Sequence, residues 1–390
     1  MNTKPRQQSQ YDFVKDHDQV YFDLLRLARI TEHYENDQNN KEAYKKAAIT
    51  ALNQLPLYAK THKRLIPLLN AKAHKLNIYD QLLPQSQQLL TTYTQQGIVT
   101  ELAKKQQLNN IIEKLSEHNI PLILLKGAAF AGVLYSPQAP RTSNDLDILI
   151  QKKHWHQTVA IIKKLMNYTQ KPQPDVFGDL YELSFIPKTK VGAALDLHSS
   201  LIHPILFNIN EQQLWENSIN HPSYNNNLVK ILSPEHALIH QALHAYKDMD
   251  FGKYNLVDSH ELISVKKPDI QKTIAIAKEW GATNSLYVLL KNCVVIMATE
   301  LENDIKNSNK VNILTQIKPS LFTCNALIKL LKSRFSQPIK NSKPLKYRLN
   351  QTMAQFVFTG SVTRPLKLQW LFVKSVFRQG RQVEPVTNEF

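Results

Sequence analysis

Cysteine and glycine are scarce in this sequence. The 390 residues include two cysteines, Cys293 and Cys324, which are too few for a disulfide framework or a zinc site. The nine glycines leave few places for left-handed turns, and this scarcity favours a largely helical protein.

Long apolar runs are missing as well. No segment reaches the roughly 20 uninterrupted apolar residues that a transmembrane helix needs. The polar N-terminus does not resemble a secretory signal. We therefore expect a cytoplasmic protein with no transmembrane segment.

The remaining composition is that of a globular protein with a strong positive charge. An apolar content of 43% and a charged content of 21% are typical of globular chains, and the length allows two or three domains. The formal net charge of +16 suggests an anionic partner: a nucleotide, a nucleic acid, a phosphorylated substrate or an anionic membrane. The many asparagines, glutamines and lysines leave a second explanation open, in which the charge reflects an AT-rich genome.

Hydrophobic periodicity divides the chain into four regions. Helical periodicity dominates the first part and returns after residue 231, whereas short apolar runs typical of buried strands lie between them. The predicted fold class is α+β, with a small mixed β-sheet flanked by helical regions. The predicted regions are an N-terminal helical region at 1–118, an α/β core at 119–230, a helical cleft region at 231–320 and a basic C-terminal region at 321–390.

Individual elements can be placed within these regions. The predicted strands are 122–125, 145–150, 181–187 and 192–198, and a hairpin is one arrangement for the last two. The predicted core helices are 128–135 and 154–166. The predicted N-terminal helices are 43–55, 61–76 and 85–116, with Pro56 and Pro84 as breakers. Ser233 followed by Pro234 predicts the start of a further helix.

A paired carboxylate begins the predicted strand 145–150. Side chains alternate along a strand, so Asp145 and Asp147 point to one face while Leu146 and Ile148 point into the core. Two like charges this close repel each other unless a cation lies between them. The pair therefore predicts a site for a hard metal ion, which usually serves phosphate chemistry.

A third acid occurs on the predicted strand 192–198. Asp196 and His198 alternate there with Leu195 and Leu197. If this strand lies beside strand 145–150, Asp196 completes a three-carboxylate cluster that can hold two magnesium ions. On its own, an Asp-X-His pattern on a strand is most often a surface pair.

Four residues near these acids are candidates for nucleotide binding. Lys126 and Gly127 end the first predicted strand, where a glycine turn and the following helix start can accept a phosphate. Arg141 and Asn144 lie just before the paired acids, and Arg141 is a candidate clamp for a triphosphate. The alternative for Arg141 is an ion pair with Asp145 or Asp147.

Three histidines share one face of the predicted helix after Ser233. His236, His240 and His244 are spaced by four residues. The pattern is not the H-E-x-x-H of a zinc peptidase, so we expect a polar face rather than a metal site. His240 and His244, together with His198, are the candidates to line the substrate cleft.

The C-terminal region combines basic and aromatic residues. Residues 329–381 contain twelve lysines and arginines and no acid. Seven aromatic residues are interleaved with them: Phe335, Tyr347, Phe356, Phe358, Trp370, Phe372 and Phe377. This pattern suits contact with single-stranded nucleic acid or an anionic membrane surface, but we favour a helical cap with buried aromatics and solvated lysines.

Three segments together resemble a known family. LLKGAAFAGVLY, RTSNDLDILI and ALDLHSSL, in this order, are similar to uncharacterised bacterial nucleotidyltransferases of the DNA polymerase β-like superfamily. The flanking segments THKRLIPLLNAKAHKL, SPEHALIHQALHAY and LVDSHELI are similar to helices of that family. The resemblance covers about residues 61–263 and identifies the α/β core as a nucleotidyltransferase core.

The resemblance implies roles for several residues. Asp145 and Asp147 would be the paired metal ligands, Asp196 would also help to deprotonate an acceptor hydroxyl, and Gly127 would mark the nucleotide-phosphate turn. Ala128 departs from the pattern, because the superfamily usually has serine or glycine there. The distance from Gly127 to Asp145 is also longer than usual.

The resulting functional hypothesis is a Mg²⁺-dependent nucleotidyltransferase. It would move a nucleoside monophosphate from an NTP to an unknown acceptor hydroxyl or phosphate on a small molecule, peptide, protein or RNA. The alternative is a non-catalytic module of the same fold that binds RNA or an anionic membrane surface.

Overall fold

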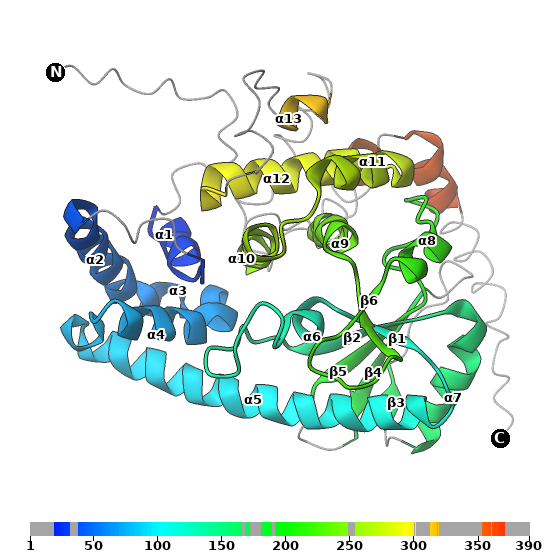
Figure 1. Ribbon diagram of the computed structural model, residues 1–390, viewed down its shortest axis with the longest axis horizontal. Helices are drawn as coiled ribbons and strands as arrows, with labels where there is room; N and C mark the ends of the chain where they lie inside the picture. The colour runs from blue at the N-terminus through cyan, green and yellow to red at the C-terminus, as the bar shows by residue number, and fades with distance from the viewer. Residues whose placement is uncertain are drawn as a thin grey trace, which may run out of the picture.

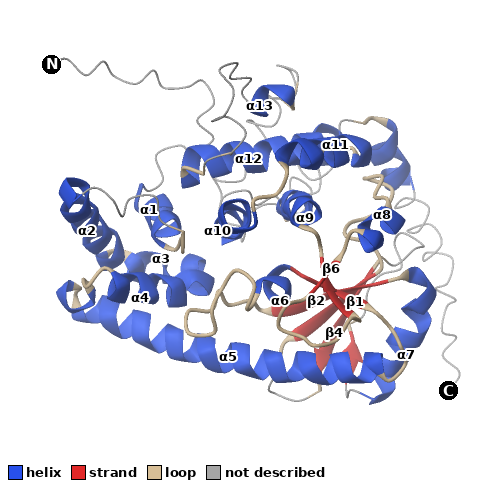
Figure 2. Ribbon diagram, in the orientation of Figure 1, coloured by secondary structure: helices blue, strands red, loops and turns tan. Residues whose placement is uncertain are grey.

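The computed structural model has helices before and after a single mixed β-sheet (Figures 1 and 2). It describes residues 19–31, 38–165, 168–171, 181–188, 192–248, 254–299, 301, 313–317, 319, 353–359 and 361–370. The predicted α+β class is confirmed.

The N-terminal region is helical, as predicted. Its elements are α1 (Gln19–Leu27), α2 (Gln38–Asn53), α3 (Leu55–His62), the 3₁₀ turn η1 (Lys63–Leu65), α4 (Ile66–Lys75), the 3₁₀ turn η2 (Tyr79–Gln81) and the long helix α5 (Pro84–Ser116). The predicted helix 61–76 is wrong at its start, because α3 continues to His62 and α4 begins only at Ile66. Pro67, in the first turn of α4, accounts for the break, since it lacks the N–H that a continuous helix would need.

Seven strands form the sheet within the described residues. They are β1 (Leu122–Leu125), β2 (Asp145–Ile150), β3 (Tyr168–Gln170), β4 (Glu182–Pro187), β5 (Ala194–His198), β6 (Ile219–Asn220) and β7 (Val229–Ile231), in the order β3-β4-β5-β2-β1-β7-β6. The four predicted strands are confirmed, and β4 and β5 pair antiparallel as a hairpin would.

Four short helical elements accompany the sheet. They are α6 (Lys126–Phe130), η3 (Lys152–His154), α7 (Trp155–Leu165) and α8 (Glu211–Glu216). The predicted helix 128–135 is wrong in both bounds, since α6 starts at Lys126 and ends at Phe130. Gly132 follows with φ +73°, a left-handed conformation that breaks the helical path.

The register of the central strands puts the acids side by side. Strand β2 is parallel to β5, with Asp147 opposite Asp196, and antiparallel to β1, with Asp147 opposite Leu125. On the next strand, Ser184 lies opposite Asp196 and Glu182 opposite His198. One face of β2, β5 and β4 therefore carries acids, a serine and a histidine.

Helix α5 runs along one side of the molecule, from the N-terminal helices to the sheet (Figure 1). Its Gln107 donates to the carbonyl of Ala193 and accepts from the Ala193 amide, both at 2.8 Å. This double hydrogen bond fixes the entry into β5 against α5. The polar face of the sheet meets α9 instead, where Lys247 donates to Glu182.

The region after the sheet is helical, as predicted. It contains α9 (Pro234–Lys247), α10 (Tyr254–Glu261), the π-helical turn η4 (Leu262–Lys266), α11 (Ile270–Trp280), α12 (Thr283–Met297) and α13 (Ile313–Gln316). Ser233 caps α9 by accepting from the His236 amide, and Pro234 occupies the first turn, which confirms the predicted start. Within the described residues, no helix has both the length and the apolar character to cross a membrane.

Part of the basic C-terminal region can be described. Helical segments 353–359 and 363–370 lie there, and Phe358 is buried with its ring centroid 5.2 Å from that of Tyr246. Phe356 is half-buried, whereas Trp370 is 59% exposed. Four of the seven aromatic residues lie outside the described residues: Phe335, Tyr347, Phe372 and Phe377. The expected burial is thus confirmed for Phe358 and wrong for Trp370.

A buried ion pair joins the α/β core to the following helices. Arg141 donates through Nε to Oδ1 of Asp258 at 3.0 Å and through Nη2 to Oδ2. The Tyr135 hydroxyl donates to the same Asp258 Oδ1 at 2.7 Å. The side chains of Arg141 and Asp258 are only 3% and 1% exposed. Each charge therefore depends on the other for its compensation.

We predict that Asp258→Asn lowers the free energy of unfolding by about 3–5 kcal/mol, because it leaves the buried Arg141 charge without a counter-ion. Glu117→Gln is the control, since Glu117 forms an exposed ion pair with Lys114 and its loss should leave stability unchanged. Urea denaturation measures both variants. Equal losses would contradict the anchoring role of the Arg141–Asp258 pair.

Candidate functional site

A cavity of about 180 Å³ opens between the polar face of the sheet and helices α9 and α10. It is lined by acids and bases from both sides together with a few neutral groups. The lining residues are Arg64, Lys126, Gly127, Arg141, Ser143, Asp145, Glu182, Asp196, Gln241, His244, Lys247, Asp248, Tyr254 and Asn255. We call this the acidic cavity.

Asp147 lies beneath the acidic cavity and keeps its negative charge. Its Oδ1 accepts from Lys126 Nζ at 2.6 Å and lies 3.1 Å from His198 Nε2. Burial alone would raise the pKa of Asp147, but Lys126 and His198 together hold that pKa far below its usual range. The ammonium group of Lys126 thus supplies a positive charge beside Asp147, and a metal ion at the paired acids stays a prediction.

The turn that carries Lys126 is tightly constrained. Lys126 has φ +49°, a left-handed conformation that is uncommon for a residue with a side chain. A Cβ atom on Gly127 would come within 2.8 Å of both Cβ and Oγ of Ser143. The close approach of the Gly127 backbone to Ser143 therefore leaves no room for a side chain at position 127. The strained backbone conformation of this turn is at Lys126.

Asp196 behaves in the opposite way to Asp147. It accepts a hydrogen bond from the Ser184 hydroxyl, which favours its charged form. Burial nevertheless raises the pKa of Asp196, and the nearby charges of Asp147 and Glu182 raise it further. Of these acids, Asp196 is the one whose environment favours taking up a proton.

Glu182 is a site residue that the sequence analysis missed. It faces the acidic cavity from β4, accepts a hydrogen bond from Lys247, and its Oε2 lies 3.8 Å from His198 Nδ1. Burial would raise the pKa of Glu182, but His198 and Lys247 lower it overall. The signal was available in the sequence, because Glu182 and Ser184 alternate with the buried Leu183 and Phe185.

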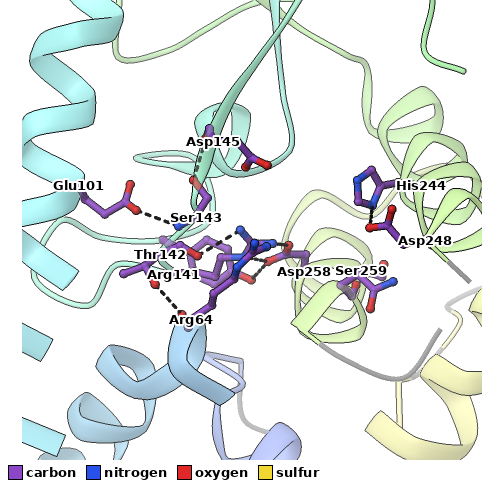
Figure 3. Close-up of polar contacts among 12 residues, drawn as sticks. Arg64, Glu101, Arg141, Thr142, Ser143, Asp145, His244, Asp248, Asp258 and Ser259 are labelled. Carbon is purple, nitrogen blue, oxygen red and sulfur yellow. Dashed lines mark hydrogen bonds and ion pairs between the residues drawn. The ribbon is translucent and has the colours of Figure 1, made fainter. Parts of the chain in front are cut away.

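The segment before the paired acids is fixed by three helices. The Thr142 amide donates to the Arg64 carbonyl at 3.1 Å, and the Ser143 amide donates to Glu101 Oε1 at 2.9 Å (Figure 3). The buried Lys104 donates to the Ser143 carbonyl at 2.9 Å. Together with the Arg141–Asp258 pair, these bonds hold Asp145 in place at the start of β2.

Two arginines stack on one tyrosine at the edge of the acidic cavity. The guanidinium carbon of Arg64 lies 4.3 Å from the centroid of the Tyr254 ring, and that of Arg141 lies 4.5 Å from it. Arg141 pairs with Asp258 rather than with Asp145 or Asp147 through Nε and Nη2, and its Nη1 donates to the Thr142 carbonyl at 3.4 Å. Arg64, which the sequence analysis missed, presents a second guanidinium to the same cavity.

The three histidines of α9 occupy different environments. His236 stacks on Trp280 with ring centroids 5.2 Å apart and serves the core. Burial lowers the pKa of His240 to about 3, so its ring is neutral at pH 7. Burial, followed by Lys126, also lowers the pKa of His244, whose Nδ1 lies 3.5 Å from Asp248 Oδ2 on the α9 side of the cavity (Figure 3).

Most of the predicted site residues therefore line the acidic cavity or lie next to it. Lys126, Gly127, Arg141, Asp145, Asp196 and His244 line the acidic cavity. Asp147 and His198 lie directly beneath it, His240 lines an adjacent cavity, and Asn144 is exposed outside both. Within the described residues, no group of three or more His, Cys, Asp or Glu side chains is already arranged to hold a metal ion.

The mixed sheet carries acids on two adjacent parallel strands, and a cavity with charged walls lies beside them. The model of a family described as "Uncharacterised nucleotidyltransferase" matches residues 55–298, which is more than half of the chain. The chain belongs to this family. No curated protein and no solved structure matches it.

We predict different stability effects for two neighbouring Asp→Asn substitutions at pH 7. Asp147→Asn removes a charged acceptor from Lys126 and His198, and should lower the free energy of unfolding by about 2 kcal/mol. Asp196→Asn removes a charge that Asp147 and Glu182 repel while it can still accept from Ser184, so it should keep or raise stability. Chemical denaturation measures both.

The pH dependence of the Asp196 effect gives a further check. The folded-state pKa of Asp196 is raised, so folded wild type binds this proton more readily than the unfolded chain. Wild type therefore gains stability as the pH falls through that pKa, and any advantage of Asp196→Asn should shrink below pH 7. A destabilisation by Asp196→Asn as large as that by Asp147→Asn would contradict this description.

Proposed function

We propose that the protein is a Mg²⁺-dependent nucleotidyltransferase of the DNA polymerase β-like superfamily. In this proposal it transfers a nucleoside monophosphate from an NTP to an acceptor hydroxyl or phosphate and releases pyrophosphate. Membership of the nucleotidyltransferase family supports the reaction class. The observation that carries the proposal is the β2–β5 register, which sets Asp147 opposite Asp196 with Asp145 on the same face.

The chemistry of the acids fits a hard divalent cation. All three candidate ligands are carboxylates, the donor type that magnesium prefers. The ammonium of Lys126 donates to Asp147 Oδ1 and helps to keep this carboxylate charged, the form in which it can bind a cation. Asp145, Asp147 and Asp196 would hold the ions, which when bound polarise the transferred phosphoryl group and help to lower the pKa of an attacking hydroxyl.

The groups of the chain can perform the remaining steps. The acceptor oxygen attacks the α-phosphorus, an O–P bond forms, and the bond from the α-phosphorus to the bridging oxygen breaks to release pyrophosphate. When the acceptor is a hydroxyl, Asp196 takes its proton, which agrees with the raised pKa of that carboxyl. Arg64, Lys126 and Lys247 offset the charge of the triphosphate from the walls of the cavity.

In this proposal the turn at Gly127 contacts phosphate through its backbone alone. Because Ser143 fills the space where a Gly127 side chain would lie, Gly127 serves the packing of the turn first. A phosphate contact at this turn would then depend on its backbone N–H groups. Ala128, which lacks a hydroxyl, adds no side-chain hydrogen bond to it.

We predict that wild type is stabilised by an NTP with Mg²⁺ or Mn²⁺, by about 2.7 kcal/mol at a ligand concentration 100 times Kd. Asp145→Asn should lose this stabilisation because a metal ligand is removed. Asp80→Asn, an exposed substitution on η2 far from the acids in sequence, is the control and should respond like wild type. Thermal unfolding with each of the four NTPs provides the measurement.

A screen of acceptors for pyrophosphate release then tests turnover itself. Asp196→Asn should reduce the rate by about 10²–10⁴-fold where the acceptor is a hydroxyl, because the proton acceptor is lost. The proposed function is excluded if no NTP shifts the unfolding temperature, or if wild type and Asp145→Asn behave alike throughout.

A further inference from the structure

A second cavity, of about 260 Å³, lies next to the acidic cavity. It is enclosed by β1, α6, β6, β7, α9 and η4, and most of its lining is aliphatic or aromatic, including Leu124, Phe130, Val133, Ile231 and Leu262. Its volume approaches the lower end, roughly 300 Å³, of pockets that bind small molecules. We call this the apolar cavity.

The polar groups of the apolar cavity lie at its two ends. Lys126 lines both this cavity and the acidic cavity, so the two adjoin at that residue. His240 is beside it on α9, one helical turn before His244 of the acidic cavity. The other end reaches the surface, where Ile219, Asn220 and Lys266 are exposed. The lining of the apolar cavity thus includes exposed residues as well as Lys126, which contacts Asp147.

The charge of the lining has a single sign. Among the described residues around the apolar cavity, the charged side chains are Lys126 and Lys266, and no acid is present. The neutral ring of His240 adds a polar group without a charge at the inner end. An apolar wall with ammonium groups selects an apolar molecule that carries a negative charge.

Two departures from regular backbone adjoin the same cavity. The π-helical turn η4 contributes Leu262 and Lys266 to its wall, and π-turns occur frequently at functional sites. Lys126, with its left-handed conformation, forms the inner end. Strained backbone is retained where the surrounding structure fixes a side chain in a particular place.

We propose that the apolar cavity binds the acceptor: a small amphipathic molecule with an apolar body and a carboxylate or phosphate head that meets Lys126. This inference rests on the proposed nucleotidyl transfer and narrows its acceptor to an anionic oxygen. That oxygen attacks the α-phosphorus, the O–P bond forms, and pyrophosphate leaves with the electrons of the broken bond. No proton moves in this step, because the head is already ionised.

Binding can be tested without any nucleotide. Isothermal titration calorimetry of the full chain would compare 4-phenylbutyrate and 4-phenylbutyl phosphate with 4-phenylbutylamine and acetate. We expect the first two to bind, the amine to bind at least tenfold more weakly, and acetate, which lacks the apolar body, not to bind. The proposal fails if the amine binds as tightly as both anions, or if neither anion binds.

A matched pair of substitutions locates the binding. Ile219 at the mouth of the apolar cavity and Ile186 on β4 are 46% and 45% exposed on the same sheet. Ile219→Glu adds a negative charge at the mouth and should weaken binding of the anions at least tenfold, whereas Ile186→Glu should leave it unchanged. Equal effects of the two variants would overturn the assignment to this cavity.

A last measurement separates this inference from the proposed function. In the presence of NTP and Mg²⁺, either anion should stimulate pyrophosphate release in wild type and in Ile186→Glu, but less in Ile219→Glu. If NTP stabilises the protein through Asp145 but neither anion stimulates release, the acceptor inference is wrong and the proposed function stands. If NTP gives no stabilisation, the proposed function itself is lost, and the acceptor inference is lost with it.

Discussion

The contact between Lys126 and Asp147 is the interaction on which the site depends. It ties the turn after β1 to the middle of β2 and keeps a buried carboxylate charged. Burial raises the pKa of Asp196, and the charge that Asp147 keeps on the neighbouring strand raises it further. Two otherwise similar aspartates thus differ, because the pKa of Asp147 is lowered and the pKa of Asp196 is raised.

The rigidity of the site comes from groups outside the sheet. Arg141 and Tyr135 reach Asp258 on α10, and Lys104 and Glu101 of α5 hold Ser143. Helices that precede and follow the sheet in the chain therefore hold the segment that leads into Asp145.

Strands in which polar and apolar residues alternate could be predicted from the sequence. Contacts between segments that lie far apart in the chain could not. Strands β2 and β5 could be predicted because acids alternate there with buried leucines, and the same alternation would have revealed Glu182 on β4. Strands β6 and β7, with two and three residues, are too short to show a period. The partner of Arg141 lies 117 residues away, and the contact between Lys247 and Glu182 depends on how α9 docks, so neither could be read from local pattern.

Lys126 also explains how two anionic substrates could approach each other. A triphosphate in the acidic cavity and an anionic acceptor in the apolar cavity would repel each other across a narrow boundary, and bringing them together costs free energy in a poorly hydrated space. The boundary is formed by the ammonium of Lys126, held in place by a strained backbone and by Asp147. Asp147 accepts one hydrogen bond from that ammonium, and a lysine ammonium has three N–H donors, so Lys126 can also donate to an anionic head in the apolar cavity and to a phosphate in the acidic cavity. The same residue would in this way offset the charge of both substrates.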